Sequence, residues 1–115
     1  MGATTFQTTI VGKFDSLTAF RMAQDRARYE HGHGGYTGTI AEKGDFIMIS
    51  CEPRQNPYKL ANELMDDHNS PVDDKWGPAG YIELQGKLKK EMVERYGLKG
   101  KKGIRAFLFF GWASC

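Results

Sequence analysis

The sequence lacks the features that mark membrane-spanning, disulfide-rich or strongly polyanion-binding proteins. No apolar run approaches the roughly 18 residues that a transmembrane helix needs, and the first residues lack the basic and apolar regions of a secretory signal peptide. The 2 cysteines, Cys51 and Cys115, are too few for a disulfide scaffold. A net charge of +2 neither demands nor excludes a polyanionic partner. We therefore expect a cytoplasmic protein with reduced thiols and no membrane contact.

What is present suits one globular domain. The 115 residues are 40% hydrophobic and 26% charged, enough for a modest core. Periodicity and turn signals predict strands over residues 4–14, 36–41, 45–51, 81–84 and 104–112, and helices over 16–30, 58–67 and 87–96. We expect a single α+β domain over residues 1–115, with the order β-α-β-β-α-β-α-β. Its sheet is expected to be mostly antiparallel, with two or three helices packed on it.

Several details follow from the same patterns. Asp15 and Ser16 supply a cap for the first helix, whose apolar stripe is Leu17, Phe20, Ala23 and Ala27. Lys43-Gly44 suits a hairpin turn between the second and third strands. Residues 46–49 and 104–112 are apolar on both faces, which favours central strands covered twice. Two such strands suggest an oligomer, most simply a twofold dimer.

The stretch least like ordinary scaffold is HGHGGYTGTIAEK, residues 31–43. Its glycines leave backbone N–H groups uncovered, and successive N–H groups can form an anion-binding nest. Histidine adds a group that titrates near neutral pH, and Tyr36, Thr37 and Thr39 add hydroxyls. We expect a pocket for a small anionic ligand here, nucleotide-like in character. The expected ligand-binding residues are Arg28, His31, His33, Gly34, Gly35, Tyr36 and Thr37.

The same loop has an ordinary structural interpretation. Gly32 stands where a helix commonly ends, so His31 would face the negative end of the helix dipole and Gly34-Gly35 would form a plain turn. The loop follows a helix and precedes a strand, whereas a phosphate loop or dinucleotide fingerprint runs from strand to helix. If the protein is an enzyme, the candidate acid–base residues are His33, Tyr36 and Glu42.

Other patterns are weaker indicators of chemistry. We expect no metal site and no cofactor, because two nearby histidines are short of the four ligands of zinc and the acidic loop over residues 66–74 lacks the calcium-loop register. Cys51 is expected to be a buried free thiol rather than a nucleophile, and Trp76 a core anchor rather than a wall of a ligand site.

A basic tract over residues 87–105 offers a third hypothesis, nucleic-acid binding. Its cations include Lys87, Lys89, Lys90, Lys101 and Lys102. Interleaved glutamates and the mild net charge favour a solvated helix and a basic turn instead.

The segment HGHGGYTGTIAEK, together with KWGPAG (residues 75–80) and the ending FFGWAS (residues 109–114), resembles small phage and bacterial proteins of no established activity. The resemblance spans most of the chain and implies a phage-borne role, such as countering a host defence. It brings no catalytic residue with it.

Taken together, these observations predict a non-enzymatic binding protein. Its ligand is expected to be a small anion or a protein partner of a phage or bacterium. The alternatives are a small hydrolase or nucleotide-modifying enzyme that uses the 31–36 loop, and a nucleic-acid binder that uses the basic tract.

Overall fold

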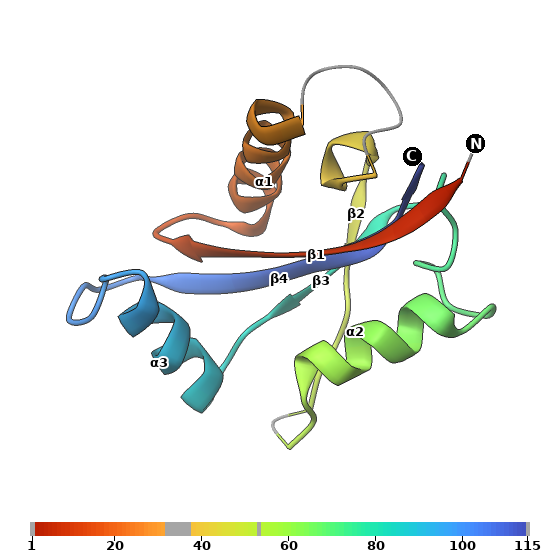
Figure 1. Cartoon of the computed structure of the whole chain (residues 1–115). Helices are drawn as coiled ribbons and strands as arrows, with labels where there is room; N and C mark the ends of the chain where they lie inside the picture. Colours follow the sequence, from red (N-terminus) through yellow and green to blue (C-terminus); the bar gives the residue numbers. More distant parts are fainter. Residues whose placement is uncertain (1, 32–37, 53, 115) are drawn as a thin grey trace.

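The sheet is organised around the strand that comes last in the sequence. In the computed structural model, which describes residues 2–31, 38–52 and 54–114, β4 (Arg105–Ser114) pairs antiparallel with β1 (Ala3–Gly12) and with β3 (Ala79–Glu83). The short β2 (Phe46–Met48) pairs parallel to β3, so the strand order is β1-β4-β3-β2. Figure 1 shows this four-stranded sheet with three helices, a single α+β domain.

The sequence of β4 explains its central place, because its large side chains alternate between the two faces of the sheet. Phe107 and Phe109 belong to one hydrophobic core, whereas Leu108 and Phe110 belong to the other, and all four are 0% exposed. A strand that is apolar on both faces has to be covered twice.

Helices and turns of this chain supply both covers. On one face lie α1 (Ser16–His31) and a 3₁₀ turn, η1 (Ile40–Glu42), while α2 (Pro57–Asp66) and α3 (Gly86–Arg95) lie on the other (Figure 1). Phe20 of α1 stacks on Phe46 of β2 with 4.6 Å between ring centroids. The first turn of α1 is capped as expected, since the Asp15 carboxylate accepts the backbone N–H of Thr18 at 2.9 Å.

The α+β class, the mostly antiparallel sheet and the three predicted helices are confirmed, but one predicted strand is absent from the part of the chain that is described. Where a strand was expected over 36–41, residues 40–42 form η1, and residues 36 and 37 lie outside the described residues. The hydroxyl of Thr39 accepts the backbone N–H of Ala41 at 3.3 Å, a local bond that competes with strand pairing. The predicted hairpin turn at Lys43-Gly44 is therefore wrong as well.

Three smaller expectations are also corrected. Strand β2 is covered on both faces but is an edge strand rather than a central one, because its only sheet neighbour among the described residues is β3. Trp76 is 65% exposed and anchors no core, and Leu17 is 45% exposed, so Ala19 replaces it in the buried stripe of α1. None of the described helices is both long and apolar enough to cross a membrane.

Candidate functional site

Two described segments flank the glycine-rich stretch of residues 32–37. The last turn of α1 leads into it and ends with Glu30 and His31, while Gly38, Thr39 and η1 lead out of it. Gly38 has φ +73°, a conformation that glycine adopts without strain. The predicted site residues His33, Gly34, Gly35, Tyr36 and Thr37 lie outside the described residues.

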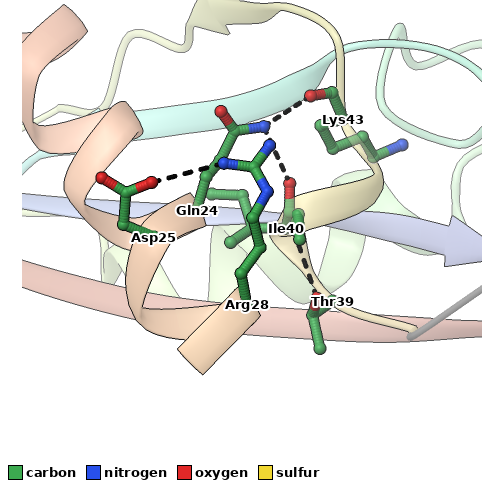
Figure 2. Close-up of polar contacts among 7 residues, drawn as sticks. Gln24, Asp25, Arg28, Thr39, Ile40 and Lys43 are labelled. Atoms are coloured by element: carbon green, nitrogen blue, oxygen red, sulfur yellow. Dashed lines mark hydrogen bonds and ion pairs between the residues drawn. The ribbon is translucent and has the colours of Figure 1, made fainter. Parts of the chain in front are cut away.

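Of the other predicted residues, Arg28 and His31 lie in the last turn of α1, and Glu42 lies in η1. His31 is exposed at the end of α1, with its Nε2 3.9 Å from a carboxylate oxygen of Glu30. Arg28 donates to the Asp25 carboxylate at 3.3 Å, one turn back along the helix (Figure 2). Glu42 is half-buried within η1. His31 lines the space between the two flanking segments, whereas Arg28 forms an ion pair with Asp25 of its own helix.

A pocket of about 220 Å³ lies between these two segments and over β1, and we call it the stem pocket. Its apolar lining residues are Phe6, Ala23, Ala27 and Ile40. Its polar lining residues are Thr8 of β1, Arg26, Glu30 and His31 of α1, and Thr39. Gln7 of β1 also borders the pocket, but its side chain donates to Asn62 of α2 at 2.8 Å. An arginine, a histidine and two threonines thus line a small space together with one glutamate, and the first three residue types are ones able to hold an anion.

The outgoing segment is held in place by a buried glutamine. Gln24, 9% exposed, reaches from α1 and donates to the carbonyl oxygens of Ile40 at 3.3 Å and of Lys43 at 2.6 Å (Figure 2). The Ile40 carbonyl also accepts the backbone N–H of Lys43 at 3.0 Å, so Gln24 adds a second bond there and binds the Lys43 carbonyl beyond the turn. The wall of the stem pocket formed by Thr39 and Ile40 is therefore fixed to α1, which forms the opposite wall.

A buried lysine continues this network to a distant loop. Lys43 is only 3% exposed, and its Nζ donates to the carbonyl oxygens of Asp74, Lys75 and Gly77 at 3.1, 3.3 and 2.9 Å. An ammonium has three N–H donors, so this cage uses all of them. Burial lowers the pKa of Lys43 to about 8, and the Asp74 carboxylate opposes this shift. The lysine fastens the 74–77 loop to the segment that leaves the glycine-rich loop.

The remaining candidate chemistry is dispersed. Burial raises the pKa of the Cys51 thiol, whose sulfur lies 3.5 Å from the carbonyl oxygen of Gln55, so this thiol is less ionised than usual. His68 of the acidic loop is bonded to Asp73 at 2.9 Å. In the described part of the chain no three histidine, cysteine or acidic side chains are grouped to hold a metal ion.

The basic tract is partly neutralised. Arg105 makes a two-pronged contact with the Glu83 carboxylate at 2.8 and 2.9 Å, and Lys99 lies 3.6 Å from a carboxylate oxygen of Glu94. Lys89 and Lys90 line a hollow of about 580 Å³ along α3, which Glu94 also borders. Acidic neighbours therefore accompany the cations of this surface.

Sequence reasoning missed Gln7, Thr8 and Arg26 of the stem pocket, and also Gln24 and Lys43 behind it. One local signal was available, since Ala23, Arg26, Ala27 and Glu30 recur at helical spacing and share a face of α1. Nothing local signals that β1 lies beneath that face. Comparisons with protein-family models, curated proteins and solved structures found no match to this chain.

Proposed function

We propose that this protein binds a small anion, a phosphate or carboxylate group, in the stem pocket. The observation that carries the proposal is the convergence of Arg26 and His31 with the hydroxyl-bearing Thr8 and Thr39 on one pocket beside a glycine-rich loop. Arginine suits the planar oxygens of carboxylates and phosphates, and histidine and hydroxyl groups add further donors.

The size of the pocket limits the ligand. Sites for drug-sized ligands measure about 300–1,000 Å³, whereas the stem pocket measures about 220 Å³. This volume suits a single anionic group or a small phosphorylated or carboxylated metabolite better than a whole nucleotide. A phage or bacterial origin, which the resemblance implies, would make sequestration of such a metabolite a reasonable biological role.

Binding is favoured over catalysis and over nucleic-acid recognition for different reasons. Of the acid–base residues predicted from the sequence, His33, Tyr36 and Glu42, only Glu42 is among the described residues, and it lies in η1 and does not line the stem pocket. The basic tract carries its own carboxylates, which weaken its attraction for a polyanion.

Isothermal titration calorimetry with inorganic phosphate, ribose 5-phosphate and succinate tests the proposal. Arg26→Gln should weaken binding of the preferred probe about tenfold or more, because a hydrogen bond to a charged group is lost. Arg21→Gln is the matched control, since Arg21 is an exposed arginine of the same helix that does not line the pocket. Glu30→Gln should tighten binding, because it removes the carboxylate beside the anion.

Two results would contradict the proposal. One is the absence of heat and of thermal stabilisation with all three probes. The other is equal affinity of the Arg26→Gln and Arg21→Gln variants, which would place the bound anion elsewhere on the surface.

A further inference from the structure

The outer edge of β1 has no strand beside it among the described residues. β1 is the first strand in the order β1-β4-β3-β2, so the backbone groups on one side of it have no partner in the sheet. In Figure 1, β1 crosses the view between α1 on one face of the sheet and α2 and α3 on the other, and no labelled element lies alongside it except β4. An unpaired edge presents a row of N–H and C=O groups to any strand that approaches it.

Within β1 itself, and among the described residues beside it in the sheet, this edge carries none of the usual guards against pairing. The segment Ala3–Gly12 reads ATTFQTTIVG and contains no charged residue and no proline. Its ten residues pair one-to-one with β4, from Ala3 opposite Ser114 to Gly12 opposite Arg105, so no bulge bends the strand away. Proteins usually protect a long edge with charge, proline, a bulge or a cover. A long edge without these devices is typical of a strand that is paired in the working form of the protein.

The surroundings of the edge form a groove. Beside Thr9 and Val11 lies a hollow of about 260 Å³, with Met22 of α1 on one side and Tyr96, which follows α3, on the other. Met22 is 44% exposed and Tyr96 is 47% exposed. Arg26 lines both this hollow and the stem pocket, so the two hollows adjoin along the strand. The groove therefore offers apolar contacts on both sides of an incoming strand.

We propose that a second copy of this chain occupies the edge, with the two β1 strands antiparallel and Gln7 on the twofold axis. This register pairs residues 3–11 of each strand over their full length, placing Thr5 opposite Thr9 and Ala3 opposite Val11. Threonine pairs across antiparallel strands are stabilising. About eight to ten backbone hydrogen bonds would form between the two copies. The result is one continuous eight-stranded sheet.

Charge complementarity favours a second copy over an unrelated strand. Arg26 and Glu30 lie one turn apart on the face of α1 that overlooks Gln7 and Thr8, since all four residues line the stem pocket. A twofold axis beside them sets the α1 helices antiparallel, which brings Arg26 of one copy towards Glu30 of its partner. The two stem pockets then lie next to each other at the axis. The dimer itself does not depend on the proposed anion binding.

Sedimentation velocity of the full chain in buffer without phosphate or carboxylate, over a wide concentration series, tests the proposal. The wild-type protein should shift from monomer to dimer mass. Gln7→Lys and Gln7→Glu should each raise the dimer dissociation constant about fivefold, because like charges meet on the axis. An equimolar mixture of the two variants should recover the dimer, because only opposite charges then meet.

The mixture of the two variants is the decisive experiment, because a variant that dimerises weakly only through poor folding would not regain the dimer when mixed with the other variant. Circular dichroism of each variant alone should match the wild type. A wild-type protein that stays monomeric at every concentration overturns the proposal. So does a dimer that neither charge weakens, or a mixture that behaves like the separate variants. These readouts use mass and not ligand heat, so the dimer and the anion site succeed or fail separately.

Discussion

Removing the charged end of the Lys43 side chain should lower the free energy of unfolding substantially. Its Nζ is buried and bonded to three backbone carbonyls of the 74–77 loop. Lys43→Met keeps the length and most of the volume of the side chain and deletes only the ammonium. We expect the variant to fold but to be less stable, with the 74–77 loop loosened from η1.

The magnitude follows from two opposing contributions. Bonds to a charged donor contribute about 1.5–3 kcal/mol each, and three of them are lost. The fall of the lysine pKa from 10.5 to about 8 means that burying the charge costs about 3 kcal/mol, which methionine recovers. We therefore expect a net loss of about 3 kcal/mol in the free energy of unfolding, a large share of the roughly 5–15 kcal/mol of a typical domain.

Urea denaturation followed by far-ultraviolet circular dichroism at pH 7 measures this loss. The matched control is Lys59→Met, an exposed lysine on α2 whose side chain has no hydrogen bond or ion pair among the described residues. If the unfolding free energies of the two variants differ by less than about 0.5 kcal/mol, the carbonyl cage does not depend on the ammonium and this reasoning is refuted.

The pH dependence provides a second check on the same residue. Between pH 8 and pH 10.5 the unfolded chain holds a proton on Lys43 that the folded chain has released. The contribution of this group therefore makes the wild type more stable as pH rises through that window. The Lys43→Met variant lacks this slope, so the stability difference between the two proteins should widen from pH 8 to pH 10.5.

Three further predictions concern the scaffold. The hydrogen bond from Arg105 holds the pKa of Glu83 below its ordinary value of 4.5, so the stability that this pair contributes is present above that pH and is lost as the pH falls through the pKa of the folded state. In an acid titration, the free energy of unfolding of Glu83→Gln should therefore fall less steeply than that of the wild type. Trp112→Phe removes the indole N–H that donates to a carbonyl of α2 at 2.6 Å, and should lower the free energy of unfolding by about 1–2 kcal/mol in urea. Gly80→Ala should cost about 1–3 kcal/mol or more by the same measurement, because its Cβ would lie 2.7 Å from the Phe110 ring; Gly44→Ala, with nothing within 4 Å, is the control and should change little.

Much of the secondary structure could be predicted because its causes are local. The Asp15 cap, the alternation along β1 and the glycine after α3 place element ends within two residues of those observed. The failure at residues 40–42 is also local in origin, since the hydroxyl of Thr39 forms a turn where the β-branched residues favoured a strand.

Other features depend on contacts that sequence patterns do not contain. Apolar residues on both faces of 46–49 indicated a strand that is covered on both faces of the sheet, which is correct. The pattern of apolar residues on a strand does not reveal whether that strand is central or at the edge of the sheet, and β2 is at the edge. The carbonyl cage of Lys43 joins residues about thirty positions apart. The stem pocket needs β1 beneath α1, so its arginine could not be distinguished from the other arginines of that helix.

The central position of β4 has a consequence for how the chain is made. β1 contacts the rest of the sheet only through β4, and β4 is the last described segment in the chain. During synthesis, β1 and β3 remain without their shared partner until β4 has left the ribosome. Until β4 is available, the outer edge of β1 and the faces of both cores are open to other chains in the cell. Loss of residues 107–114 would delete every pair between this strand and β3 and eight of its ten pairs with β1, and so would separate β1 from the rest of the sheet.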